Sequence, residues 1–278
     1  MNLNGIRTNL NVLRLSSVLP LKIVFVLFFH VFFSISNKVF LRLHDLEPVA
    51  RIIHVRDLAS VRFAAKALEA AVVVGLDCEW RPYKKWMLPN PVSFFQISTP
   101  TESFLLDLLA LRPPLSAASS LGVESFHGIG KADSGLLSDT GDSNTSMAIA
   151  GLECFQMVDA LFKRTSCAKV GFGFGEDLRK LNDSYPDWWG VLAPPQPIYD
   201  LLGGLPVDHS DVSRGAAVRG GVSASTGGLS ALVEKHLGKP LDKRMQTSDW
   251  AARPLTKDQE EYAALDARCL VSLYSALF

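Results

Sequence analysis

Two carboxylates stand two residues apart at the end of an apolar, β-branched run, and their spacing suggests what chemistry the chain could do. Asp77 and Glu79 occur in the segment Gly75-Leu76-Asp77-Cys78-Glu79-Trp80. In an extended strand, residues two apart point to the same side. Carboxylates aimed together from a buried strand repel each other, and a cation between them offsets that repulsion. Alone, the pair is better explained as a strand that runs into a solvated acidic turn.

A further carboxylate follows a glycine-rich strand in the middle of the chain. Asp177 lies in the segment 169–178 (KVGFGFGEDL), in the first turn of an expected helix. An acid at a helix N-terminus is favoured by the helix dipole, which is a sufficient structural explanation by itself. The glycine spacing matches neither the GxxxxGK[ST] nor the GxGxxG pattern, so a phosphate-binding loop of either kind is excluded.

A phenol and a carboxylate share one face of the expected last helix. Tyr262 and Asp266 are four residues apart, while Leu265, Cys269 and Leu270 place the neighbouring positions in the core. Polar groups beside a buried stripe need partners. An i,i+4 pair on a half-exposed helix is the simpler explanation when this motif is taken alone.

The elements that position these residues follow from hydrophobic periodicity and turn signals. Thr256 and Gln259 form a capping box at the start of the last helix. Three strands in quick succession predict an antiparallel meander, and the later alternation of helices and strands predicts an α/β domain with a mixed sheet. The predicted strands cover residues 49–55, 72–76, 93–98, 103–106 and 169–174, and the predicted helices cover residues 57–71, 155–163, 176–181, 229–237 and 257–276.

Three segments fall outside this pattern. Residues 113–151 and 203–228 are rich in small and polar residues and are expected to be flexible insertions in a domain that spans residues 46–278. Residues 1–45 form a leader with no acidic residue before Asp45 and an apolar run at 21–35, which is shorter than the roughly 18–20 residues of a membrane span. Four interpretations of the leader stay open: a signal-peptide core, an uncleaved anchor, an organelle transit peptide, or a segment foreign to the mature protein.

Composition narrows the class of protein without identifying a substrate. The chain has 278 residues, of which 48% are hydrophobic, and equal numbers of basic and acidic residues, 28 each, give a net charge of zero. Bulk charge therefore does not indicate a nucleic-acid partner, and any such contact must come from local patches. The four cysteines have no zinc-ligand spacing and are expected to be reduced thiols. We expect an intracellular protein, in the nucleus or cytoplasm, with organelle or membrane association only through residues 1–45.

The three motifs occur in an order and wording that together resemble the DEDDy 3′–5′ exonucleases, most closely the ribonuclease D and Werner-type branch. Segment 237–267 (LGKPLDKRMQTSDWAARPLTKDQEEYAALDA) is very similar to the stretch that leads into the third motif of that branch. The resemblance extends over residues 55–277 apart from the two insertions. It implies an RNase H-like (DnaQ-like) fold, a mixed central sheet flanked by helices, and hydrolysis at the 3′ end of single-stranded or frayed RNA or DNA.

The resemblance also implies roles for the motif residues. Asp77, Glu79 and Asp266 would hold the ion that activates water, and Asp77 and Asp177 would hold a second ion near the leaving oxygen. Tyr262 would orient the attacking water. Chemistry supports the assignment, because two Mg²⁺ or Mn²⁺ ions roughly 4 Å apart stabilise both the attacking and the leaving oxygen, and both metals prefer carboxylate ligands.

Contacts to the strand must come from local basic and aromatic side chains, each of which could equally be an ordinary surface group. An alternative function is a nucleic-acid-binding module with the same fold and little turnover. A protein partner is not identified by the sequence, and membrane contact is expected only if the leader is retained. The candidate nucleic-acid contacts are Trp80, Arg81, Lys84 and Lys85 after the first motif, and Lys239, Lys243, Arg244 and Arg253 before the last.

Overall fold

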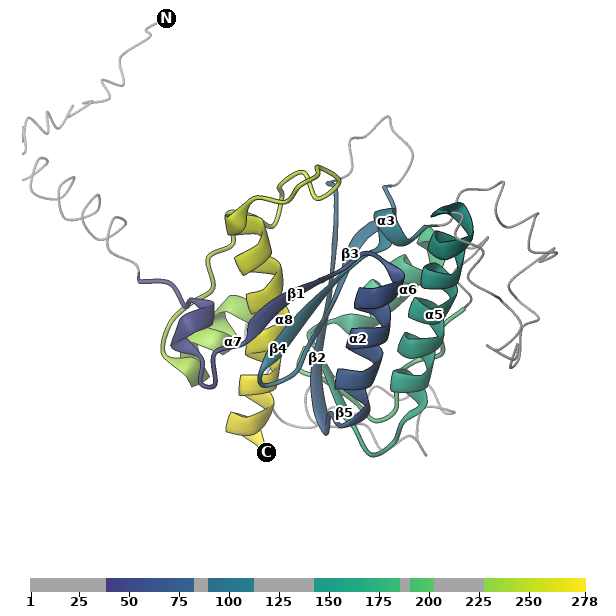
Figure 1. The fold of residues 1–278 in the computed structure, drawn as a ribbon. Coiled ribbons are helices and arrows are strands. Elements are labelled where there is room, and N and C mark those ends of the chain that lie inside the picture. The colour runs from purple at the N-terminus through teal and green to yellow at the C-terminus, as the bar shows by residue number, and fades with distance from the viewer. Residues whose placement is uncertain (1–38, 83–89, 113–142, 186–190, 203–227) are drawn as a thin grey trace, which may run out of the picture. The chain divides into compact units, whose positions relative to one another are not determined.

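A six-stranded mixed sheet forms the centre of the computed structural model (Figure 1). The structure describes residues 39–82, 90–112, 143–185, 191–202 and 228–278. The strand order is β1-β4-β3-β2-β5-β6. The strands are β1 (Arg51–Val55), β2 (Val73–Trp80), β3 (Val92–Ser98), β4 (Glu102–Asp107), β5 (Ala168–Gly171) and β6 (Ile198–Asp200).

Strands β2, β3 and β4 form the predicted antiparallel meander at the middle of this sheet. The turn between β3 and β4 falls where it was expected, and the backbone N–H of Thr99 donates to the carbonyl of Glu102 at 2.7 Å. Strand β1 pairs parallel with β4, and β5 and β6 continue the sheet in parallel from β2. The predicted α/β class and mixed sheet are therefore confirmed.

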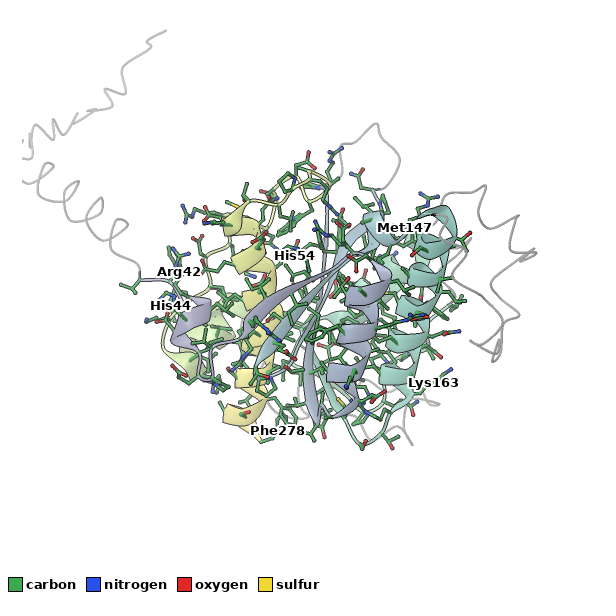
Figure 2. All side chains as sticks on the ribbon, viewed as in Figure 1. Arg42, His44, His54, Met147, Lys163 and Phe278 are labelled. Atoms are coloured by element: carbon green, nitrogen blue, oxygen red, sulfur yellow. The ribbon has the colours of Figure 1, made fainter. Side chains whose placement is uncertain are left out.

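Helices cover both faces of the sheet. The cluster that joins β2 and β3 to α2, α5 and α6 includes Leu76, Phe95 and Phe174, whereas α8 packs on the opposite face with Val73 and Val170, as Figure 1 shows for α8 against α2 and α5. Side chains fill the space between the layers, and Lys163 at the end of α5 lies at the periphery (Figure 2). The helices are η1 (Leu43–Asp45), α2 (Leu58–Glu69), α3 (Leu108–Leu111), α5 (Ser143–Lys163), α6 (Phe174–Ser184), α7 (Gly228–Leu237) and α8 (Lys257–Leu277).

The alternation of side chains along β2 decides what faces α8. Val74, Leu76 and Cys78 point into the cluster with α2 and α5. The intervening positions, which include Asp77 and Glu79, face the side of α8, because successive residues of a strand point to opposite faces. The strand thus buries an apolar set on one face and presents carboxylates on the other.

Several boundaries differ from the sequence predictions. Helix α5 begins at Ser143, so residues 143–151 were wrongly assigned to an irregular insertion. Its first turns carry small residues such as Ala148 and Ala150, which are buried and give little periodic signal. Strand β5 ends at Gly171 rather than at Phe174, which begins α6. The short β6 and α3 were not predicted, because three or four residues carry too little pattern.

The N-terminal boundary also lies earlier than residue 46. Leu41 and Leu43 are buried within the unit that begins at Phe40. Residues 1–38, with the apolar run of the leader, lie outside the described residues, as do residues 113–142 and 203–227 of the insertions. Within the described part of the chain, no helix is both long enough and apolar enough to cross a membrane.

Candidate active site

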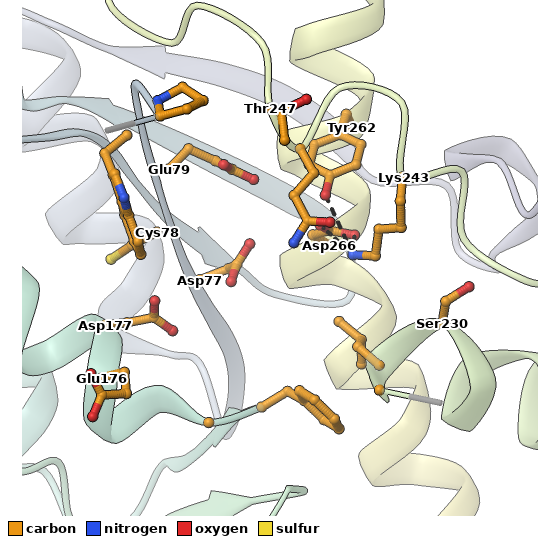
Figure 3. A pocket seen from close by; sticks show the side chains of 17 residues that line it. Asp77, Cys78, Glu79, Glu176, Asp177, Ser230, Lys243, Thr247, Tyr262 and Asp266 are labelled. Carbon is orange, nitrogen blue, oxygen red and sulfur yellow. Dashed lines mark hydrogen bonds and ion pairs between the residues drawn. The ribbon is translucent and has the colours of Figure 1, made fainter. Parts of the chain in front are cut away.

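Three carboxylates from two elements meet at one point. Asp77 and Glu79 extend from β2 and Asp266 extends from α8, and one oxygen of each lies within 4.8 Å of the others. Glu79 and Asp266 are buried, at 7% and 4% exposure, while Asp77 is partly exposed. Figure 3 shows the three side chains converging from the strand and the helix. Two motifs separated by nearly the whole domain therefore form one acidic cluster.

A glycine on β2 permits this approach of helix and strand. A Cβ atom at Gly75 would lie 1.9 Å from the carbonyl oxygen of Ala267 on α8. Real Cβ atoms essentially never come so close to another heavy atom. Because Ala267 follows Asp266 and Gly75 precedes Asp77 by two residues, the close packing at Gly75 brings the two carboxylates together.

The start of α6 delivers Asp177 to the same pocket. Gly173 caps the helix at a φ of 73°, a conformation that side chains other than glycine rarely adopt. The carboxylate of Asp200, at the end of β6, accepts hydrogen bonds from the backbone N–H groups of Gly173 (2.7 Å) and Leu202 (3.0 Å). Asp200 thereby holds the turn that carries Asp177. Sequence reasoning missed Asp200, because it depends on the unpredicted strand β6.

Tyr262 and Lys243 complete the wall of the pocket beside Asp266. The Lys243 Nζ donates to Asp266 Oδ2 at 2.9 Å and Oδ1 at 3.2 Å, and to the Tyr262 hydroxyl at 3.4 Å. Tyr262 lies one turn before Asp266 on α8, and its ring packs 5.9 Å from that of Trp250. Among the described residues that line the pocket, Lys243 is thus the one with a positive charge, and it faces the acidic cluster.

Burial and mutual repulsion disfavour the ionised state of these acids. Burial, and then the charges of Asp266 and Asp177, hold the pKa of Asp77 well above its usual range. The pKa of Glu79 is raised in the same way, by burial and then by Asp77. Burial, followed by Asp200 and Glu176, raises the pKa of Asp177 to about 7. Burial opposes the charge of Lys243, but the charge and hydrogen bond of Asp266, together with the charge of Asp77, raise the pKa of the lysine.

The donor set fits hard divalent cations. The pocket has a volume of about 640 Å³ and is lined by all five motif residues: Asp77, Glu79, Asp177, Tyr262 and Asp266. Carboxylate oxygens are the ligands that Mg²⁺ and Mn²⁺ prefer. Cys78 sits between the two β2 carboxylates in the chain, but it points into the apolar core and burial raises the pKa of its thiol. The clustered acids thus provide oxygen ligands whose repulsion a cation would relieve.

The candidate nucleic-acid contacts divide into those at the pocket and those elsewhere. Lys243 and Trp80 line the pocket, and the Lys180 Nζ lies 5.8 Å from the Trp80 ring centroid. Arg81 forms an exposed bidentate pair with Asp249, with a shortest distance of 2.6 Å. This pair links the end of β2 to the loop that follows Lys243. Lys84 and Lys85 lie outside the described residues.

The remaining three candidates do not line the pocket and already contact acidic groups. Lys239 pairs with Asp45 at 2.8 Å, and Arg244 pairs with Asp242 at 2.6 Å. Arg253 makes a bidentate pair with Asp107 at 2.6 Å, and its guanidinium lies 4.2 Å from the Phe94 ring centroid. Its local partners give Arg253 a structural role in holding the loop against the sheet.

Several residues line the pocket that the sequence did not single out. The aromatic Phe172, just before α6, and the apolar Leu229, on α7, are among them. The carboxylate of Glu176 lies beside that of Asp177 (Figure 3). Phe172 lies in the glycine-rich segment that contains Asp177, so the sequence pattern could have indicated that it lies near the site. The pattern could not have indicated Leu229, because only the fold brings α7 to this pocket.

The central strand of the mixed sheet carries two carboxylates, and the C-terminal helix adds a third beside them. This combination of sheet and acidic cluster is the RNase H-like nuclease fold. The 3′–5′ exonuclease family matches residues 52–278. The chain belongs to this family, and the resemblance seen in its motifs is confirmed.

Curated relatives agree with this assignment. The chain is 31% identical to the human exonuclease mut-7 homolog over 221 residues, which are 78% of this chain and 21% of that protein. It is 43% identical to ribonuclease D of Pseudomonas paraeruginosa over 77 residues, 28% of this chain and 20% of that protein. The match thus spans about a fifth of either relative (21% and 20%).

Solved structures show the same fold. The EXO domain of Aedes aegypti Nibbler superposes with a TM-score of 0.57 at 22% identity, covering 86% of this chain and 91% of that one. Ribonuclease D of Trypanosoma brucei, in complex with the RNA U12, superposes with a TM-score of 0.53 at 17% identity, covering 84% and 63%. The likeness confirms the predicted RNase H-like architecture.

Proposed function

We propose that this protein is a metal-dependent 3′–5′ exonuclease that shortens single-stranded or frayed nucleic acid one nucleotide at a time. The observation that carries the proposal is the convergence of Asp77, Glu79 and Asp266 within 4.8 Å in a pocket that Asp177 and Tyr262 also line. Family membership agrees with this chemistry. The T. brucei ribonuclease D crystallised with RNA favours RNA as the substrate to test first.

The proposed cofactors are two Mg²⁺ or Mn²⁺ ions. Asp77, Glu79 and Asp266 would hold one ion, and Asp77 and Asp177 would hold the other. Such a pair of ions supplies an activated water and stabilises charge on the leaving oxygen. Each carboxylate offers about four lone-pair sites, so Asp77 is able to serve both ions.

The other pocket residues act on the water and the strand. The Tyr262 hydroxyl orients the attacking water from its fixed position against Trp250. With cations bound at the cluster, Asp266 would no longer need the Lys243 ammonium as its partner, and Lys243 would be free to neutralise phosphate charge of the strand at the pocket. Trp80 and Phe172 give the pocket aromatic surface on which a terminal base stacks.

The proposal is tested by degradation of a 5′-labelled single strand, RNA and DNA in parallel, with Mg²⁺, Mn²⁺ or EDTA. A metal-dependent ladder that shortens from the 3′ end is expected for the wild type and not for Asp77→Ala. Asp183→Ala is the matched control, because it removes an exposed carboxylate of α6 that pairs with Arg179 at 3.4 Å. Strand binding without any ladder, unchanged by Asp77→Ala, would instead establish a binding module.

A further inference from the structure

Gln96 is a buried amide for which the structure shows no partner. It lies in the middle of β3 with 0% exposure. Neither its Nε2 nor its Oε1 has a hydrogen-bond partner in the described part of the chain. Buried polar groups in native proteins are nearly always hydrogen-bonded, so an exception calls for an explanation. Packing against α2 and α5 does not explain the missing partner. Phe95 and Ile97, the chain neighbours of Gln96, point to that side of the sheet, so Gln96 points to the other side.

The register of the sheet places Gln96 directly opposite Asp77. The two residues are paired in the antiparallel β2–β3 ladder. Side chains at directly opposed positions share one face of the sheet, with Cβ atoms about 4.5–5.5 Å apart. An amide and a carboxylate at that separation are able to form a hydrogen bond through ordinary rotamers. The acidic cluster is therefore the immediate polar neighbour of the Gln96 amide.

The other neighbours of Gln96 on this face offer less. Leu105, its partner on β4, is apolar and fully buried. The hydroxyls of Ser98 and Ser103, farther along the same strands, bond to each other at 2.8 Å. Of the two residues directly paired with Gln96, Asp77 on β2 and Leu105 on β4, Asp77 is the one whose side chain carries hydrogen-bond acceptors.

We propose that Gln96 is a positioning residue for Asp77: when cations are bound, its amide N–H, which has no partner in this structure, donates to the Asp77 carboxylate and fixes the orientation in which that carboxylate binds the cations. The inference rests on the proposed function, in which Asp77 serves both ions. A carboxylate that accepts one hydrogen bond still has lone pairs with which to bind cations. The amide adds no charge, so it orients Asp77 without competing with the cations.

Substituting a residue that hydrogen-bonds to a metal ligand has a characteristic effect on metal affinity. Loss of such a partner typically weakens metal affinity by about 10- to 100-fold. Replacing an unpaired buried amide with an apolar group of similar shape should, by contrast, leave the metal-free fold as stable as before or more stable. Methionine has the length of glutamine and no hydrogen-bonding amide. Gln96→Met therefore separates a positioning role from a structural one.

The experiment measures Mn²⁺ binding to the full chain by calorimetry and the melting temperature in EDTA. For Gln96→Met we expect the Mn²⁺ dissociation constant to rise about tenfold or more, with an unchanged or higher melting temperature in EDTA. Exonuclease activity should fall at low Mn²⁺ and recover as Mn²⁺ is raised, because the loss is one of affinity. An unchanged dissociation constant in the folded variant would overturn the proposal.

Two further variants and the wild type keep the result unambiguous. Gln96→Leu removes the amide with a different shape and should reproduce the effect if Gln96→Met does not fold. Ser98→Ala removes a polar atom from the same face of β3, two residues farther along, and should leave Mn²⁺ binding intact. Equal weakening by Ser98→Ala would overturn the proposal, since disturbance of the strand alone would then be sufficient. A wild type that binds no Mn²⁺ would refute the proposed metal site itself and the inference with it.

Discussion

The backbone of Gly75 on β2 lies against the carbonyl of Ala267 on α8, so close that a Cβ atom would come within 1.9 Å of that oxygen. This contact joins the strand that carries Asp77 and Glu79 to the helix that carries Asp266. The acidic cluster therefore depends on a residue with no side chain of its own. Four consequences of the site's geometry are open to measurement.

Gly75→Ala should disrupt both stability and activity. A clash with backbone is relieved only by moving α8 away from the sheet, so we expect a loss of about 3 kcal/mol in the free energy of unfolding, the upper part of the usual range for overpacking. Displacement of Asp266 should also weaken Mn²⁺ binding. Urea denaturation and Mn²⁺ titration measure the two effects. Gly175→Ala, where a Cβ atom would meet nothing within 4 Å, is the control and should be nearly neutral. Equal stability of the two variants would contradict the argument.

The metal-free protein should lose stability as the pH rises from about 4 to about 7. Asp177 has a pKa of about 7 in the fold against an ordinary value of 3.8, so in this window the folded state binds more protons than the unfolded state. The free energy of unfolding then falls with increasing pH. Melting temperatures in EDTA at pH 5 and pH 7.5 test this. Asp177→Asn should flatten the slope, while Asp77 and Glu79, whose pKa values are also raised, sustain part of it. A variant that keeps the full wild-type slope would refute the attribution to Asp177.

Lys243→Met should bind Mn²⁺ more tightly and the strand more weakly. The Lys243 ammonium occupies the same carboxylate oxygens of Asp266 that a cation would use. Its removal should lower the Mn²⁺ dissociation constant on the order of tenfold, about 1.4 kcal/mol. The KM for a single strand should rise, because a positive charge at the pocket is lost. Lys239→Met, at a lysine paired with Asp45, is the control for a general loss of charge. Weaker Mn²⁺ binding in Lys243→Met would contradict the competition.

Tyr262→Phe should reduce kcat by about 100-fold while Mn²⁺ affinity and KM stay near the wild type, because the hydroxyl acts on the water and not on the strand. The fold should be retained, since the ring keeps its packing against Trp250. Single-turnover cleavage measures the rate of the chemical step, and Mn²⁺ calorimetry measures the metal affinity. Tyr274→Phe, on the same helix but packed against Tyr199, should leave kcat unchanged. An unaltered kcat in Tyr262→Phe would remove the tyrosine from the proposed mechanism.

Local sequence was sufficient to predict most elements and to select five motif residues that line one pocket in the structure. The apolar, β-branched run of β2 and the capping box of α8 are short-range signals, and both appear in the structure where they were expected. The order of three motifs along the chain was specific enough to indicate the family, which the match over residues 52–278 confirmed. Short elements such as β6, and the first turns of α5, lacked the periodicity that such prediction requires.

Contacts between distant segments were decided by the tertiary structure alone. The sequence shows Arg253 and Lys243 as similar basic residues of one loop, yet Arg253 is bound to Asp107 while Lys243 faces Asp266. It shows Gln96 as a polar residue with apolar neighbours on either side, and only the β2–β3 register places that amide opposite Asp77. The physical reason is that secondary structure depends largely on side-chain type and on the spacing of neighbouring residues, which the sequence shows directly. The partner of a buried charge or amide depends instead on how distant segments pack across the sheet.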